Sequence, residues 1–372
     1  MSSPRHITAA ERRTRLALSH RLAASTRAGT PEEVADSLVA LHGTDPATVF
    51  LAVGARLADP TVTVDETARA LYEDRTLLRM HGMRHTVFVF PADLTAVVHA
   101  STGLAVAARE RASLVKDMAK AGAPDAVWLK EVEDATLAAL ARRGQATAAE
   151  LAEDEPRLRE QWVYAPGKNY EGVHTLSTRL LRVLGVEGKV VRGRPLGGWT
   201  SSQLRWAVAP EHPELDVAEA QSALLRRWLT ACGPATEADL KWWTGWRVTE
   251  VRRALAAIGA EPVSLDEGAG YVAAGDVDPP ADPAEPWAAL LPGLDPTAMG
   301  WQHRDWYLPP ELRPALFDGS GNVGPTVWRN GRVVGSWAQR PDGEIVWRVL
   351  DRTDVGGEAE AAIGEAAERL RG

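Results

Sequence analysis

The chain has 372 residues, of which 45% are hydrophobic and 25% are charged, proportions typical of an ordinary globular protein with several domains. Its single cysteine, Cys232, excludes an intrachain disulfide and any multi-cysteine zinc site, which fits a reducing compartment. The N-terminus leads into a charged helix rather than a signal peptide, and no apolar run of about 18 residues occurs. We therefore expect a cytoplasmic protein without a membrane span.

The charge is unevenly distributed. A net charge of −8 argues against a nucleic-acid partner, because such proteins bind largely by neutralising phosphates. Two segments are nevertheless strongly basic: the first helix, and a later run that comprises Arg179, Arg182, Lys189, Arg192, Arg194 and Arg205. Each basic segment either contacts nucleic acid or forms a solvent-exposed basic face, and the sequence leaves both interpretations open.

The first folding unit has clear helix signals. Thr30-Pro31-Glu32-Glu33 is a capping box with proline at the first helical position, and it opens a helix that we expect to end at Gly43. Further helices are expected over 47–57 and 63–78, followed by a β run over 86–90 that Pro91 ends. Three helices followed by a strand is the order of a winged helix-turn-helix.

Two later segments repeat this plan. The segments that start at Gly144 and Gly233 align at an offset of 89 residues (233 minus 144), which indicates a duplicated unit. After a long helix over 93–120, the second unit uses a capping box from Thr147 to Glu150, and its last helix ends at Gly185 before a strand. The third unit has helices over 224–232, 236–243 and 248–258, then a hairpin over 261–273 with residues 268–270 at its tip.

The sequence predicts a small β-sheet in the C-terminal part. Strands are expected over 324–328, 331–337 and 344–349, with hairpin turns at Asn330-Gly331 and Asp342-Gly343, and a final helix over 358–371. A proline-rich acidic linker over 276–286 precedes it. The sequence thus predicts an α+β fold of three tandem winged helix-turn-helix units plus a C-terminal antiparallel β domain, divided as 1–115, 116–215, 216–280 and 281–372.

No familiar cofactor motif is present. The sequence has no phosphate-binding glycine loop, no nucleophile elbow and no cluster of residues with metal-ligand spacing. We therefore expect neither a cofactor nor a metal ion.

Five blocks carry a resemblance to a known family. The segments 38–46, 83–88, 232–245, 290–296 and 333–337 look like the signature blocks of the AlkZ/YcaQ family of winged-helix DNA glycosylases, in the family's order and over nearly the whole chain. No lysine beside His42 is placed to form a Schiff base with the sugar, so we expect a monofunctional enzyme. We also expect a glycosylase to bind DNA as a monomer. The reaction that the resemblance implies is hydrolysis of the N-glycosidic bond of N7-alkylated guanine in double-stranded DNA, for bulky or crosslinking adducts. Several family members confer self-resistance to a DNA-alkylating natural product.

The sequence departs from the family at the catalytic motif. Where members carry Gln-x-Gln or Gln-x-Asp, this chain has His42-Gly43-Thr44. An N7-alkylated guanine is already cationic, so the enzyme need only hold a water and stabilise an oxocarbenium-like sugar. Imidazole, with an ordinary pKa of about 6.5, can accept that water's proton or hydrogen-bond the water. The Thr44 hydroxyl can position the water, and Asp45 can support the sugar cation or act as the base. Alternatively, His42 only satisfies the helix end and the chemistry is lost or located elsewhere.

Further residues are candidates for DNA contact. The resemblance places Arg84 and His85 next to the lesion, although Arg84 could instead pair with Asp93 or Glu73 while His85 caps a strand. It also places the loop that contains His303 and Arg304 near DNA. From the second basic run, the candidates are Arg179, Arg182 and Arg192.

Another class of function stays open. Winged helices often serve transcription, so a DNA-binding regulator or a drug-sequestering protein is the alternative. A regulator would carry a recognition helix rich in Arg, Asn and Gln, whereas the expected third helices over 63–78 and 248–258 offer few such residues. This observation favours the enzyme.

Overall fold

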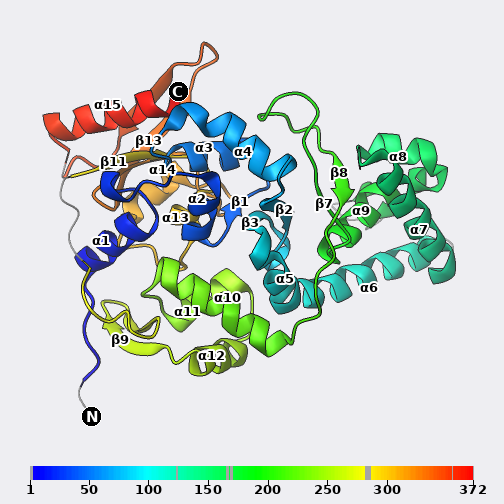
Figure 1. Cartoon of the computed structure of the whole chain (residues 1–372), viewed down its shortest axis with the longest axis horizontal. Helices are drawn as coiled ribbons and strands as arrows, with labels where there is room; N and C mark the ends of the chain where they lie inside the picture. The colour runs from blue at the N-terminus through cyan, green and yellow to red at the C-terminus, as the bar shows by residue number, and fades with distance from the viewer. Residues whose placement is uncertain are drawn as a thin grey trace.

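The computed structural model describes residues 3–122, 125–164, 167, 171–280, 286–353 and 355–371. The fold mixes helices with small antiparallel sheets, in agreement with the predicted α+β class. Figure 1 shows the first helix-and-sheet unit in the middle of the molecule, and the second unit beyond the long helix α6. The third unit lies below the first, and the C-terminal sheet with helix α15 lies on the side opposite the second unit (Figure 1).

The first unit contains the three predicted helices. They are α2 (Pro31–Leu38), α3 (Pro46–Gly54) and α4 (Thr63–Tyr72). The Thr30 hydroxyl caps α2 by accepting a hydrogen bond from the backbone N–H of Glu33 at 3.2 Å, as the capping signal predicted. The helices pack on a three-stranded sheet in the order β1 (Leu41–His42), β3 (Val87–Pro91), β2 (Leu77–His81).

Three predicted helices in this region differ from those in the structure. Helix α2 ends at Leu38 rather than Gly43, because Val39 has a φ of 65° and the next residues pair with β3. Helix α4 ends at Tyr72, and the last residues of the predicted third helix belong to strand β2, whose apolar pattern suits either structure. The predicted helix over 93–120 is divided into α5 (Thr95–Val98), a π-helical turn (His99–Gly103) and α6 (Leu104–Lys120). The predicted domain boundary at residue 115 falls inside α6.

The second unit repeats the topology of the first. Its helices are α7 (Ala126–Arg143), α8 (Ala148–Asp154) and α9 (Leu176–Val186). Its sheet has the order β4 (Gln145–Ala146), β8 (Trp206–Val208), β7 (Val190–Arg192), so the strand before the second helix again pairs with the last strand. The capping box of Thr147 and Glu150 is present, as predicted. A hairpin of β5 (Gln161–Tyr164) and β6 (Gly172–Thr175) is inserted between α8 and α9 and was not predicted.

The third unit has the same order of elements. Helices α10 (Val217–Cys232), α11 (Glu237–Thr244) and α12 (Val248–Ala257) precede the hairpin of β9 (Glu261–Leu265) and β10 (Gly268–Val272). A single bridge between Ala235 and Tyr271 takes the place of the short first strand. The predicted hairpin tip is wrong, because the turn lies at 266–267 and residues 268–270 pair within β10. The chain before α1 (Ala9–Ser19) runs along β9, since the backbone N–H of Ile7 donates to the Ser264 carbonyl at 2.9 Å.

The C-terminal sheet has one more strand than predicted. Its order is β11 (Ala288–Leu291), β12 (Thr326–Arg329), β13 (Arg332–Gln339), β14 (Ile345–Val349), and the additional strand is β11. The turn at Asn330-Gly331 has positive φ at both residues, 45° and 78°, as the type I′ prediction requires. Two short helices, α13 (Pro296–Met299) and α14 (Arg313–Leu316), lie between β11 and β12, and α15 (Gly357–Arg371) packs on the sheet. Within the predicted linker, residues 281–285 lie outside the described part of the chain.

An aromatic cluster joins the third unit to the C-terminal sheet. Trp228 on α10 contacts both Trp243 on α11 and Trp301, and Trp301 contacts Trp306 in turn. These rings are buried, so they hold the two parts together by removing large apolar surfaces from water. Among the described residues, no helix has both the length and the apolar character needed to cross a bilayer.

Candidate functional site

His42 lies at the end of β1, in the centre of the first unit. It pairs with Phe88 across the sheet, and the two rings meet edge to face with their centroids 5.5 Å apart. The side chain is half-buried, and its Nδ1 atom is buried without a hydrogen-bond partner among the described residues. Burial, and then the nearby Arg84 cation, lower the pKa of His42 to about 4, although Asp45 opposes the shift. His42 is therefore a neutral imidazole at pH 7.

The backbone of the His42-Gly43-Thr44 tripeptide is clamped by Arg79, a residue that the sequence analysis missed. The Nε atom of Arg79 donates to the Gly43 carbonyl at 2.5 Å, and Nη2 donates to the Thr44 carbonyl at 2.9 Å. Arg79 is only 2% exposed, and no carboxylate in the described chain forms an ion pair with it. On the other side, the Gly43 N–H donates to the Val87 carbonyl at 2.8 Å. Both hydrogen-bonding edges of the tripeptide are thus fixed by the first unit's sheet.

Glycine is required at the middle of the tripeptide by a close approach. A Cβ atom added to Gly43 would lie 3.0 Å from the backbone carbonyl carbon of Phe88, and backbone cannot move aside easily. The side chains of His42 and Thr44 therefore flank a position that only glycine fits comfortably.

Thr44 and Asp45 are exposed and begin helix α3. One oxygen of Asp45 caps the helix by accepting from the Ala47 N–H at 3.0 Å, while the other forms no hydrogen bond with the described residues. Asp45 is also the carboxylate that acts on the pKa of His42. The loop therefore presents a neutral imidazole, a hydroxyl and a carboxylate within three or four residues, all attached to one rigid backbone.

Arg84 and Arg304 converge on one tryptophan beside this loop. The guanidinium of Arg84 lies 4.2 Å from the ring centroid of Trp242, and that of Arg304 lies 5.0 Å from the same centroid. Burial, and then Arg304, lower the pKa of Arg84. Neither arginine has a carboxylate partner in the described chain, so the suggested pairing of Arg84 with Asp93 or Glu73 is wrong. Glu73 pairs with Arg194 instead.

Trp242 differs in burial from the two tryptophans next to it in the chain. Trp243 and Trp246 are buried, whereas Trp242 is half-buried and covered by the two arginines. The three interacting residues come from the first unit, the third unit and the loop before β12. The sequence signals for this junction were the 83–88 block, which contains Arg84, and the loop that contains Arg304, but their meeting point depends on the tertiary fold.

Other predicted contact residues gather around acidic partners. His85 and Arg182 both approach Glu110, each at 3.2 Å, and Arg179 pairs with Asp117 at 3.4 Å. The suggested capping role of His85 is therefore replaced by a contact with Glu110 on α6, and burial lowers the pKa of His85, so this contact is not an ion pair at pH 7. His303 lies 3.2 Å from the Thr236 hydroxyl, next to buried Asp239. Arg192 stacks on Trp206 at 3.6 Å, and burial lowers its pKa to about 9.

Two cavities are bordered by candidate site residues. One, of about 620 Å³, is bordered by Arg84 and His85 together with Gln221 and Trp246. Another, of about 610 Å³, reaches from Asp45 and Thr48 to the segment around Phe317. None of residues 42–44 lines either cavity, so the structure places Asp45, but not His42, at a cavity wall.

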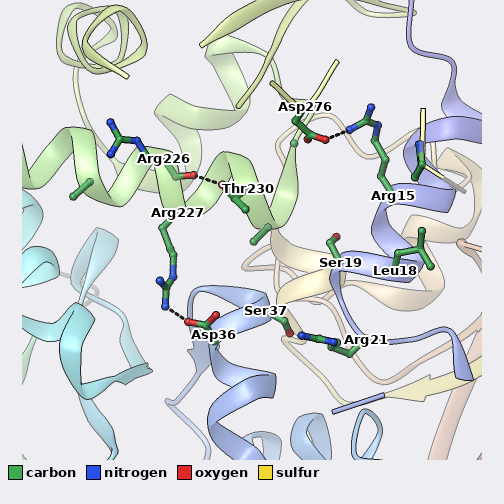
Figure 2. Close-up of a pocket in the computed structure, with 14 residues that line it drawn as sticks. Arg15, Leu18, Ser19, Arg21, Asp36, Ser37, Arg226, Arg227, Thr230 and Asp276 are labelled. Carbon is green, nitrogen blue, oxygen red and sulfur yellow. Dashed lines mark hydrogen bonds and ion pairs between the residues drawn. The ribbon is translucent and has the colours of Figure 1, made fainter. Parts of the chain in front are cut away.

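A larger cavity, of about 780 Å³, lies between α1, α2 and α10 and is lined by several arginines. Figure 2 shows that Arg227 points to Asp36 and that Arg15 points to Asp276, so much of its positive charge is compensated. No residue of the His42-Gly43-Thr44 tripeptide lines it.

One group of side chains has spacing suitable for a metal ion: Asp239, Glu267 and His303. The oxygens of Asp239 already accept from the backbone N–H groups of Gln302 and His303 and from Thr236, and Glu267 pairs with Arg12. Hydrogen bonds and an ion pair account for this cluster, so its donor set does not call for a metal.

The comparisons with known proteins agree with this geometry. Residues 35–372 match the family described as DNA glycosylase AlkZ-like. The chain belongs to this family, and it is a DNA glycosylase that acts on DNA. Its fold is similar to that of the DNA glycosylase AlkZ of Streptomyces sahachiroi, with a TM-score of 0.72 and 19% identity over 97% of this chain and 95% of that one. No curated protein matches the chain.

Proposed function

We propose that this glycosylase hydrolyses the N-glycosidic bond of N7-alkylated guanine in duplex DNA, including bulky adducts of natural products. Its role would be base excision repair and self-resistance to such an alkylating agent, in the cytoplasm and as a monomer. We also propose that the three topologically alike units serve as tandem winged helices. The observation that carries the proposal is the loop on which a neutral imidazole, a hydroxyl and a carboxylate lie within four residues, with Asp45 at the wall of a cavity.

The geometry supports a mechanism with little acid or base assistance. The C1′–N9 bond of an N7-alkylated guanine breaks with its electron pair moving to the cationic base, which leaves neutral. Since its pKa is about 4, His42 is no stronger a base than a carboxylate, and its main role is to hold the water by a hydrogen bond. Thr44 donates or accepts a second hydrogen bond, and Asp45 stabilises positive charge at C1′. The water oxygen bonds to C1′ and its proton passes to solvent.

The cations around the loop suit a negatively charged duplex. Arg84 and Arg304 lack carboxylate partners in the described chain, so their charge is available to phosphate groups. We assign weaker backbone contacts to His85, Arg179, Arg182 and His303, each of which has an acidic neighbour. We also assign a phosphate contact to Arg192, which stacks on Trp206 and has no carboxylate partner in the described chain. Arginine stays protonated and does not form a Schiff base, which supports a monofunctional enzyme without lyase activity.

The test is base release from a defined duplex. Purified protein is incubated with DNA that carries N7-methylguanine or a bulky N7-guanine adduct, and abasic sites are detected by alkaline cleavage. We expect release, and a rate at least about 100-fold lower for His42→Ala. His6→Ala, which removes an exposed histidine beside β9, is the matched control and should retain full activity.

Each outcome has a distinct meaning. Release that survives His42→Ala would remove the imidazole from the mechanism and leave the substrate assignment intact. Absence of release from every adduct, with DNA binding retained, would contradict the proposed substrate and favour a regulator or a drug-sequestering protein.

A further inference from the structure

A cavity of about 480 Å³ lies between the first and second units and is lined by five arginines: Arg75, Arg143, Arg192, Arg194 and Arg205. They come from the segment after α4, the end of α7 and both sides of the β7–β8 connection. Two of the five have acidic partners, since Arg143 pairs with Asp154 at 2.6 Å and Arg194 pairs with Glu73 at 2.8 Å.

The other three arginines are not neutralised. Arg75 donates to the Val208 carbonyl at 3.2 Å, and Arg205 donates to the Arg194 carbonyl at 2.7 Å. Arg192 lies on the face of Trp206. In the part of the chain that the structure describes, none of these three guanidinium groups has a carboxylate within 4.0 Å. Three like charges around one cavity repel one another, so their common position is unfavourable unless an anion joins them.

The cavity wall is held in place by specific contacts. The Gln145 side-chain oxygen accepts from the backbone N–H of Arg194 at 3.1 Å, and a Cβ at Gly193 would lie 2.8 Å from that same oxygen. This close contact keeps the backbone between Arg192 and Arg194 against β4. Stacking on Trp206 restricts Arg192 further, so less entropy is lost when its guanidinium binds a ligand.

Arg79 acts both on the tripeptide that contains His42 and on one arginine of this cavity. Arg79 holds the Gly43 and Thr44 carbonyls, and its charge acts on the pKa of Arg192 as well as on that of His42. Leu78, its neighbour on β2, lines the cavity.

We propose that this cavity binds a phosphate of the DNA backbone, with Arg75, Arg192 and Arg205 as its ligands, and so fixes the duplex against the first two units. The proposal rests on the proposed function in that a duplex is the substrate. The planar forks of guanidinium groups match phosphate oxygens, and a phosphodiester supplies the negative charge that the three side chains lack. Free inorganic phosphate has the same chemistry and is the other source to be tested.

The test measures binding, not catalysis. Fluorescence anisotropy with a labelled, undamaged duplex gives the dissociation constant between 50 and 200 mM salt, roughly the range in which phosphate contacts dominate the salt dependence. We expect Arg75→Gln and Arg192→Gln each to weaken binding and to reduce the slope of log K against log salt by about one. Arg352→Gln, an exposed arginine near the C-terminal helix, removes one charge elsewhere and is the matched control.

A second measurement locates the contact. Single neutral methylphosphonate linkages are placed along the duplex, one position at a time. At one position the linkage should strongly weaken DNA binding by the wild-type protein but hardly affect DNA binding by Arg192→Gln. Arg192→Lys keeps the charge and should keep the salt slope, which separates loss of the contact from loss of folding.

The outcomes are distinguishable from those of the base-release assay. The phosphate site would be overturned if the salt dependence of DNA binding has the same slope for Arg75→Gln and Arg192→Gln as for Arg352→Gln. This conclusion holds whether or not base is released. If the variants instead lose only the thermal stabilisation that inorganic phosphate gives the wild type, the cavity binds a free anion and the assignment to DNA is overturned. A reduced slope without base release would contradict the proposed substrate alone.

Discussion

Arg56 and Asp295, which are 239 residues apart in sequence, form a fully buried ion pair with two hydrogen bonds of 2.9 and 2.8 Å. Arg56 follows α3, and Asp295 caps α13 by accepting from the Thr297 N–H at 2.9 Å. Arg56 also donates to the His20 carbonyl and to the Thr297 hydroxyl. Because Asp45 begins α3, this pair fixes the helix that carries one end of the candidate site against the C-terminal part.

Removal of one partner should be costly. Asp295→Asn leaves the Arg56 cation buried without its counter-charge, so the free energy of unfolding should fall by about 3–5 kcal/mol. Urea unfolding followed by tryptophan fluorescence measures the change. Glu344→Gln breaks an exposed ion pair with Arg340 and should lower the free energy of unfolding by less than about 1 kcal/mol. Equal effects of the two substitutions would show that the buried pair contributes no more than a surface pair.

His20 should make the protein sensitive to acid. It is fully buried between Thr297 and Cys232, and burial, then the Arg56 cation, lower its pKa to about 3. The unfolded chain takes up the proton near pH 6.5 whereas the folded protein does not. Stability is therefore complete above pH 6.5 and is lost as the pH falls toward 3, by up to about 2 kcal/mol at pH 5 for this residue alone.

The measurement is the urea midpoint at pH 7 and pH 5. His20→Gln keeps a hydrogen-bonding side chain without a titrating ring, so its midpoint should depend less on pH, even if it is lower at pH 7. His6→Gln, at an exposed site, should behave as the wild type does. An unchanged acid dependence in His20→Gln would assign the sensitivity to other groups, such as His81, whose pKa burial also lowers to about 3.

Local signals predicted the elements of the fold well, and tertiary contacts explain the failures. Capping residues such as Thr30 and Thr147 mark helix starts because they act within one turn, and the Asn330-Gly331 turn requires only two residues. Strand β2 was missed because its apolar run suits a helix equally well, and only pairing with β3 decides. The division of the 93–120 helix also depends on neighbours, since the π-helical turn packs against α10.

The candidate site could be predicted in part, for a similar reason. His42, Thr44 and Asp45 are neighbours in sequence, so a motif could locate them together. Arg79 and Trp242 carry no such signal, because what they do depends on strands and helices that meet only in the folded chain. The pKa of His42 was also taken as ordinary, since burial and the Arg84 cation cannot be read from residue order.

The low pKa of His42 predicts an unusual pH profile. If the neutral imidazole holds the water, single-turnover base release should be nearly constant from pH 8 to about 5, because an imidazole with a pKa of about 4 is still largely neutral at pH 5. An unshifted histidine would instead give an acid limb near pH 6.5. The profile is measured under single-turnover conditions, so that product release does not mask it. An acid limb between pH 6 and 7 that is absent in His42→Ala would show that the imidazole titrates normally.

Arg79 should affect the rate of base release rather than DNA affinity. Arg79→Gln frees the carbonyls of Gly43 and Thr44, and a displacement of about 1 Å at the catalytic loop should lower the single-turnover rate by roughly 100-fold. The dissociation constant for duplex DNA should stay the same, since Arg79 is buried. Arg79→Lys keeps a charge and can reach one of the two carbonyls, so it should restore part of the rate.

The pH profile separates positioning from a merely structural role for Arg79. Its charge lowers the pKa of His42, so removing it in Arg79→Gln should move the acid limb of base release upward, while Arg79→Lys should leave the limb near its original position. If Arg79→Gln weakens DNA binding and leaves the rate unchanged once the DNA is saturating, Arg79 contacts the substrate. Arg79 only stabilises the sheet if Arg79→Gln lowers the rate without moving the acid limb and Arg79→Lys restores none of that rate.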